Sequence, residues 1–183
     1  MERNIALIAL FAALIAVLGL VPKLTLMSGI PITAQSLGVM LCGTVLGARR
    51  GMLAVLLFLL LVALGLPLLA GGRGGLGVFA GPTVGFLIGW VAGAYVIGLL
   101  TAKLTSLPLG LAAAGAAAIG GIVVLYVPGI IGMMIMLDMT LQTAFLSIFA
   151  FIPGDLIKAG LAGAITASLA RARPGIVASR PAG

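Results

Sequence analysis

Apolar residues run almost without interruption along this chain, and the few charged residues divide them into six apolar stretches. These stretches are apolar on every side, so their lengths and their Gly and Pro breakers locate the helices better than any periodicity does. A membrane-spanning helix takes about 20 apolar residues. The pattern therefore predicts an all-α chain with helices near 5–21, 33–48, 51–69, 82–103, 108–127 and 153–172.

Three stretches between the predicted helices, 22–32, 70–81 and 128–152, are rich in Gly or Pro and still largely apolar. We expect loops or broken segments there. At membrane depth, irregular backbone is tolerated only where other parts of the protein bury it or where it lines a cavity.

The composition identifies an integral membrane protein. Hydrophobic residues make up 63% of the chain and charged residues 7%, against about 25% charged in soluble domains, and the mean hydropathy is +1.39. The 183 residues hold six spans as a single transmembrane domain, 1–183, with a short basic tail at 173–183. A secretory signal peptide is the alternative for the first segment, but its apolar run exceeds the usual core of about 7 to 15 residues.

Basic residues, which give the chain a net charge of +7, gather at the ends of the predicted helices. With six crossings, only Lys23 and Arg73 fall on one side, and basic residues mark the cytoplasmic side. Both termini are therefore predicted to be cytoplasmic, with the three irregular stretches facing outward. The charge points to the lipid bilayer, not to nucleic acid, as the partner. The residues on the cytoplasmic side are Arg3, Arg49, Arg50, Lys103, Arg171, Arg173 and Arg180.

Residue types that catalysis and metal binding need are scarce. The chain has no histidine and only three acidic residues, which argues against a metal site. Cys42 and the serines lack an evident base, and no Walker motif is present to power transport with ATP. A binding protein without a cofactor is the remaining class.

Asp155 and Lys158 stand three residues apart at the entrance of the last predicted helix, a spacing that places both on one helical face. Ionisable groups inside a membrane segment are costly and mark functional candidates. The alternative is structural: Pro153 opens the helix, Asp155 sits at its positive end, and Lys158 extends to the membrane interface.

Seven glycines fall within the fifteen residues from Gly71 to Gly85. The βαβ context of a nucleotide-binding glycine motif is absent. We expect a tight loop whose backbone approaches a ligand, although a compact connector fits equally well. Pro82 and Thr83 are typical of a helix start, whose free N–H groups would face the outer cavity.

Isolated polar and aromatic side chains add candidates. Thr33 either binds a ligand or caps the second helix, whereas Gln35 has no capping role to explain it. Tyr126 fits an interfacial aromatic belt or a ligand pocket equally well, and Trp90 lies deep enough in its segment for packing.

Small residues four apart form two stripes on the first helix, Ala9 with Ala13 and Ala12 with Ala16. One stripe suffices for internal packing. The second makes this helix a candidate for docking another membrane subunit. The last helix carries two further stripes, Ala159–Gly163–Ala167 and Gly160–Ala164–Ser168.

Three motifs, in this order and spacing, resemble the BioY family, the biotin-binding S components of energy-coupling factor (ECF) vitamin transporters. They are PITAQSLGV from Pro31 followed by LGARRG from Leu46, GGLGVFAGPTVGFLIG from Gly74, and PGDLIK from Pro153. The resemblance covers nearly the whole chain. It implies the six-helix S-component fold with both termini inside a bacterial cytoplasmic membrane, and a site that encloses biotin from the outer side.

The resemblance also implies partners: a transmembrane coupling subunit, docked on Ala9 and Ala13, and ATPase subunits that supply the energy while the membrane subunit topples. Biotin is then the transported ligand. An S component for another vitamin and a structural membrane subunit without a ligand are the alternatives, and self-association stays open. The candidate ligand-binding residues are Asp155, Lys158, Gln35, Thr33, Arg73, Gly75, Gly77, Phe79, Thr83, Phe86 and Tyr126.

The sequence departs from the family pattern in two places. Val84 and Phe86 stand where the family usually has Gly and Tyr, and Gly132 or Met133 stands where a Trp is common. Loss of the tyrosine hydroxyl removes one potential ligand contact but keeps an aromatic wall.

Overall fold

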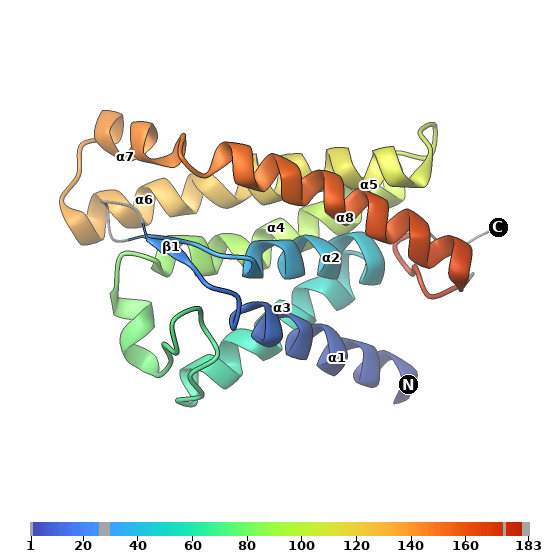
Figure 1. Cartoon of the computed structure of the whole chain (residues 1–183), viewed down its shortest axis with the longest axis horizontal. Helices are drawn as coiled ribbons and strands as arrows, with labels where there is room; N and C mark the ends of the chain where they lie inside the picture. The colour runs from blue at the N-terminus through green and yellow to red at the C-terminus, as the bar shows by residue number, and fades with distance from the viewer. Residues whose placement is uncertain (1, 26–29, 174, 181–183) are drawn as a thin grey trace.

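The structure is a computed structural model and describes residues 2–25, 30–173 and 175–180. This part of the chain is helical apart from a short antiparallel ribbon in which Leu24 pairs with Ile32. Figure 1 shows the arrangement. The elements are α1 (Glu2–Leu18), β1 (Leu24–Thr25), β2 (Pro31–Ile32), α2 (Gln35–Leu46), α3 (Ala48–Ala63), the 3₁₀ helix η1 (Leu76–Ala80), α4 (Val84–Lys103), α5 (Leu109–Ala118), the π-helical turn η2 (Ile119–Val124), α6 (Leu125–Leu137), α7 (Leu141–Ile148) and α8 (Ile152–Ala172).

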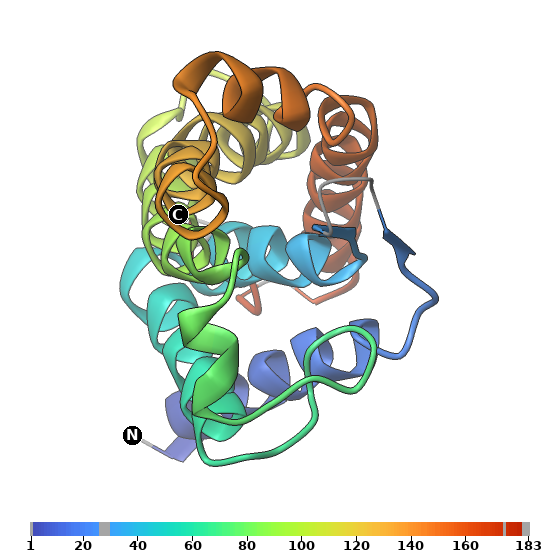
Figure 2. The same ribbon diagram turned by 90° about the vertical axis from the view of Figure 1, so that its left-hand side faces the viewer.

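Helix α2 lies at the centre of the molecule, with α1 and α3 on one side and α4 and α8 on the other (Figure 2). Ten of its twelve residues are buried. A helix that is enclosed on all sides must be apolar all round, which is how α2 reads in the sequence.

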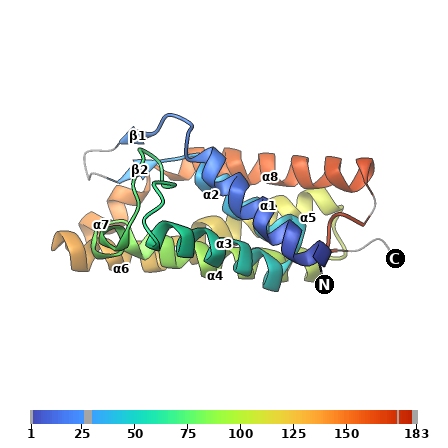
Figure 3. The ribbon, with the colours of Figure 1, turned by 90° about the horizontal axis from the view of Figure 1, so that it is seen from below.

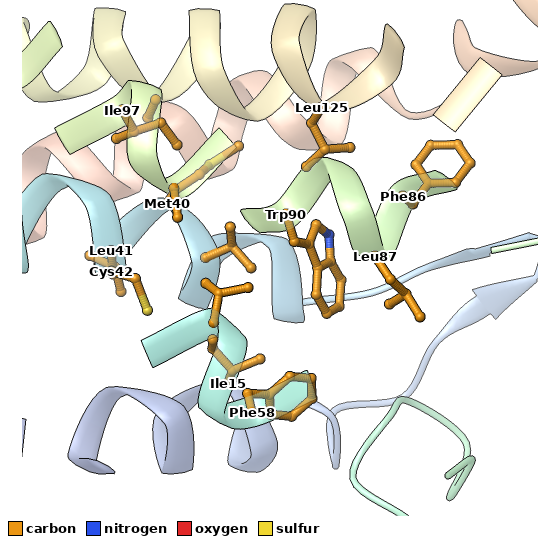
Figure 4. Packing of buried hydrophobic residues seen from close by; sticks show 14 of the residues in the cluster. Ile15, Met40, Leu41, Cys42, Phe58, Phe86, Leu87, Trp90, Ile97 and Leu125 are labelled. Carbon is orange, nitrogen blue, oxygen red and sulfur yellow. The ribbon is translucent and has the colours of Figure 1, made fainter. Parts of the chain in front are cut away.

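Side chains from α1, α2, α3 and α4 pack together in the core (Figure 4). Ile15, Met40, Phe58 and Ile97 are fully buried. The ring of Trp90 lies 6.1 Å from that of Phe58, so Trp90 takes part in packing as its position predicted.

Small residues allow the helices to approach closely. A Cβ atom at Gly43 would come within 2.6 Å of Ile97 on α4, and one at Gly163 within 2.8 Å of Ala114 on α5. On α8, Ala159 and Gly163 are buried, whereas the stripe of Gly160, Ala164 and Ser168 is exposed. One of the two predicted stripes therefore packs inside the chain.

The junction of α2 and α3 differs from the prediction, which left Arg49 and Arg50 between two helices. Both arginines lie in the first turn of α3, and Gly47 alone separates the helices. Gly47 has φ +80°, a conformation that glycine adopts without steric cost. The prediction also extended this helix to residue 69, but it ends at Ala63, before Gly65 and Pro67.

The stretch 128–152, predicted as a loop or a broken segment, is mostly helical, and a break occurs only between α6 and α7 and at the bend before α8. Helix α6 continues to Leu137, α7 follows, and the segment Leu109–Leu137 runs as one 29-residue span. Pro128 lacks an N–H donor and would usually end a helix. The π-helical turn η2 ends four residues before Pro128 and widens the helix where the hydrogen-bond ladder is disturbed.

Two helices in the described residues, α4 and Leu109–Leu137, are long and apolar enough to cross a membrane. The α7–α8 pair, bent by 49°, makes a third if it counts as one span. Helices α1, α2 and α3 are shorter, with 17, 12 and 16 residues. The glycine-rich stretch between α3 and α4 lies beside the β1–β2 ribbon (Figure 3).

Candidate ligand-binding site

Helices α2 and α8 begin side by side, and the ionisable pair lies where they meet. Asp155 stands in the first turn of α8, after Pro153, and Lys158 follows one turn later. Lys158 Nζ lies 2.9 Å from Asp155 Oδ1, the one ion pair found within the described residues. The spacing predicted this shared face correctly.

The remaining contacts of Lys158 tie α8 to the start of α2. Its ammonium donates to the Thr33 carbonyl oxygen at 2.8 Å and to Ser36 Oγ at 2.9 Å. Its side chain is only 15% exposed. Lys158 therefore points into the protein, and the alternative in which it extends to the membrane interface is wrong.

The carboxylate of Asp155 is held from two further directions. Tyr126 Oη donates to Asp155 Oδ2 at 2.7 Å, and Ser36 Oγ lies 3.2 Å from Oδ1. Each carboxylate oxygen thus has a partner within the protein. Hydrogen bonds to the charged form, together with the ammonium, stabilise an ionised carboxylate in an apolar environment.

Three aromatic rings stand beside the pair. The ring centroids of Phe86, Tyr126 and Phe151, which come from α4, α6 and the start of α8, are 5.9 to 6.4 Å apart. Such tilted and edge-on packing forms a rigid apolar wall. Phe86, which replaces the tyrosine usual in the family pattern, contributes its ring to this wall.

The ionisable pair and the aromatic wall border one cavity that is open to the surface. Most of the lining is apolar. Its polar groups come mainly from α2, from α8 and from the loops that precede α2 and α4. The lining residues are Ile30, Ile32, Thr33, Gln35, Ser36, Leu69, Arg73, Thr83, Phe86, Leu87, Trp90, Leu125, Tyr126, Phe151, Asp155 and Lys158.

Gln35 fastens the segments around the cavity. Its amide nitrogen donates to the carbonyl oxygens of Ile15 and Leu68, each at 3.1 Å, and its amide oxygen accepts from the Ala70 N–H at 2.9 Å. These bonds join α1, α2 and the stretch after α3. Gln35 is 1% exposed, and its polar atoms satisfy backbone groups that would otherwise be buried without partners.

Arg73 reaches the cavity from a tight turn. Leu69 and Arg73 pair as an antiparallel bridge, and the turn between them contains Gly71 and Gly72, with φ of +82° and +70°. Arg73 Nη1 lies 3.5 Å from Thr83 Oγ1. Partial burial lowers the pKa of Arg73 from its ordinary value, but a guanidinium stays protonated.

Gly75, Gly77 and Phe79, which were candidates, do not line the cavity. The 3₁₀ turn η1 directs this stretch away from it, and Phe79 borders an apolar groove between α3 and α4 instead. Added Cβ atoms at Gly75 and Gly77 would meet no heavy atom within 4 Å. The other eight candidates all line the cavity.

Sequence reasoning missed Ser36 and Phe151 as cavity residues and favoured packing for Trp90, which packs and also lines the cavity. Ser36 follows Gln35 directly, so its position in the first turn of α2 was the available signal. Phe151 precedes Pro153, but its contact with Phe86 depends on the bend between α7 and α8, which the sequence does not indicate.

The two stripes of α1 lie next to one another on the helix but differ in exposure. Ala9 and Ala13 are exposed, whereas Ala12 is 2% exposed and packs in the core. One stripe therefore serves internal packing, and the other leaves a smooth outer surface.

The fold matches that of a class of membrane transport subunits. A crystal structure described as the S-component for biotin from an ECF-type ABC transporter superposes with a TM-score of 0.89 and 32% identity, covering 96% of this chain and 94% of that one. The BioY family model matches residues 2–175. The chain belongs to the BioY family.

Two characterised relatives support this assignment. The biotin transporter BioY of Rhodobacter capsulatus is 51% identical over 189 residues, covering 98% of this chain and all of the relative. That of Rhizobium etli is 54% identical over 166 residues, covering 87% and 89%.

Proposed function

We propose that this chain is the substrate-binding subunit of an ECF transporter that takes up biotin. The observation that carries the proposal is the cavity in which Asp155, Lys158 and an aromatic wall converge, on a chain of the BioY family. The chain acts as a transport protein and not as an enzyme. Biotin is its transported ligand, and no cofactor takes part.

The charges of the cavity suggest how biotin lies in it. Biotin combines a neutral cyclic urea, a sulfur-containing ring and an aliphatic chain that ends in a carboxylate. Asp155 and Lys158 neutralise one another, so together they suit the neutral urea, and the carboxylate has lone pairs left to accept its N–H groups. Phe86, Tyr126 and Phe151 would cover the apolar rings.

Arg73 then meets the carboxylate of biotin. It lines the cavity, and within the described residues its side chain donates to the Ala70 carbonyl oxygen and to Thr83 Oγ1, not to an acid. A guanidinium binds a carboxylate through two parallel N–H donors. Thr33 and Thr83 would complete the polar lining.

We further propose six crossings of a bacterial cytoplasmic membrane, with both termini inside. The segments are α1, α2, α3, α4, Leu109–Leu137 and the α7–α8 pair. Positive charge favours the cytoplasmic side. Arg3 Nη2 donates to the Gly175 carbonyl oxygen at 2.7 Å, which supports both termini lying at one end of the molecule.

The proposed partners are a transmembrane coupling subunit and ATPase subunits of an ECF module. The exposed stripe of Ala9 and Ala13 is the proposed contact, because small residues permit close helix approach where no hydrophobic effect drives association. Self-association of this chain is left open.

Uptake of radiolabelled biotin tests the function. A biotin-auxotrophic bacterium without its own biotin transporter should accumulate biotin when it expresses this chain together with an ECF module. Lys158→Ala should abolish uptake, and Lys103→Ala, an exposed lysine at the end of α4, should not. The proposal fails if the wild-type chain reaches the membrane and biotin does not accumulate.

A further inference from the structure

The chain after α8 folds back onto the end of α2 that lies away from the cavity. We call residues 175–180 the C-terminal strap. Val177 and Ser179 are 3% and 5% exposed. The N–H groups of Ala178 and Ser179 donate to the Val45 carbonyl oxygen at 2.7 and 3.2 Å, and Ser179 Oγ donates to that of Thr44. This segment is packed and hydrogen-bonded, unlike a free basic tail.

The strap supplies partners that α2 cannot find elsewhere. The last carbonyl groups of a helix have no donors within it, and α3 follows α2 after Gly47 alone. A Cβ atom at Gly47 would stand 3.3 Å from Ser179 Cα, so the missing side chain leaves space for the strap.

The strap also joins other elements at the same end. The Arg180 guanidinium donates to the carbonyl oxygens of Leu104, Thr105 and Leu107 in the α4–α5 connection. Arg3 at the start of α1 donates to Gly175. The strap thus ties α1, α2 and the end of α4 together.

Helices α2 and α8 are linked at both of their ends. At the cavity, Lys158 bonds to Thr33 and Ser36. At the strap, Thr166 Oγ1 of α8 donates to Thr44 Oγ1 of α2 at 2.8 Å. The carbonyl oxygen of the same residue, Thr44, accepts from Ser179 Oγ. A buried helix of about 18 Å moves largely as one body, so displacement at one end is felt at the other.

We propose that the C-terminal strap is a latch whose closure on Thr44 and Val45 is coupled, through α2, to occupancy of the cavity. The closed strap holds Thr33 and Ser36 against Lys158 and so favours the ligand-binding arrangement. Release of the strap frees the far end of α2 and lowers affinity. The proposal rests on the proposed function only for the identity of the ligand.

Linkage makes the test quantitative. If the closed strap and the bound ligand favour the same state, the two effects are reciprocal. The factor by which loss of the strap raises the ligand Kd must equal the factor by which bound ligand lowers the equilibrium constant for strap opening. Two quantities are measured on the purified full chain: the biotin Kd by calorimetry, and hydrogen exchange at Ala178 and Ser179 with and without biotin.

A chain ending at Arg173 should bind biotin about five-fold or more weakly. Saturating biotin should slow exchange in the wild-type strap by a similar factor. If the truncated chain does not fold, Ser179→Ala, which removes one hydrogen bond, should raise Kd by about two-fold or more. Ser168→Ala, at an exposed serine of α8, is the matched control and should change neither quantity.

The latch is wrong if the biotin Kd is unchanged in the strap variants, or if biotin does not change the rate of hydrogen exchange in the strap. The strap would then be only a structural cap on α2. Failure of the wild-type chain to bind biotin at all would instead contradict the proposed function. The two failures are therefore distinguishable in the same experiment.

Discussion

Lys158 uses all three of its N–H donors within the protein, on Thr33, Ser36 and Asp155. Burial of two charges is costly, and such a pair is stable only when the remaining polar atoms also find partners. Ser36 and Tyr126 provide these for Asp155. The result is a rigid polar group without net charge, suited to a ligand group that is itself neutral and both donates and accepts hydrogen bonds.

A double variant should separate the effect of this ion pair on protein stability from its effect on biotin binding. Lys158→Met leaves Asp155 charged and unpaired, and should lower the free energy of unfolding by about 3 kcal/mol, the lower end for broken buried pairs. Asp155→Asn/Lys158→Met removes both charges and should regain most of that loss. Neither variant should bind biotin. Thermal unfolding and calorimetry measure the two properties, with Lys103→Met as control. Biotin binding by the double variant at wild-type affinity would refute the role of the pair.

Arg73 should matter only for ligands that carry the carboxylate. Arg73→Gln should weaken biotin binding by about ten-fold or more, since a charge-assisted hydrogen bond contributes about 1.5–3 kcal/mol. It should leave the affinity for the uncharged biotin amide unchanged. Competition between the two ligands measures the effect. Lys23→Gln is the matched control, an exposed cation that does not line the cavity. An equal loss for both ligands would exclude the carboxylate contact.

Among the elements, α1 presents its two stripes to different surroundings, and only the Ala9–Ala13 face is exposed. A bulky side chain on this face should block close helix approach without disturbing the core. Ala9→Trp should release the coupling and ATPase subunits on co-purification while biotin binding persists. Ala164→Trp, on the exposed stripe of α8, is the matched control. If Ala9→Trp retains the partner subunits, the docking surface lies elsewhere on the chain.

Elements bounded by clear breakers could be predicted from the sequence. Helix α4 begins after Pro82 and α8 includes Pro153, within two residues of the predicted starts. The stretch from 128 to 152 could not be predicted, because a proline in a membrane helix is compatible with either a break or a continuous helix. The π-helical turn that decides between them has no sequence signature.

The candidate site was predictable where chemistry stands out against an apolar background, as with Asp155, Lys158 and Gln35. It was not predictable where backbone or common side chains take part. The Thr33 carbonyl reaches Lys158 only because α2 and α8 begin together, a contact across 125 residues. Gln35 was sought as a ligand contact, and the structure gives its amide to three backbone groups.

At the scale of the whole molecule, the two ends of α2 have different surroundings. The cavity lies at the start of α2, with Arg73 and the ionisable pair in its wall. The far end is bordered by the strap, Arg3 and Arg180. A cavity at one end and basic residues at the other fit a protein that receives its ligand outside and meets its partners inside.

Calorimetric titration of the purified wild-type protein tests most directly whether the cavity binds biotin. We expect tight binding of one biotin per chain and loss of that binding in Lys158→Ala. Absence of biotin binding by folded wild-type protein would rule out biotin as the ligand. Tight binding of a different vitamin in the same titration would then identify another substrate for this S component.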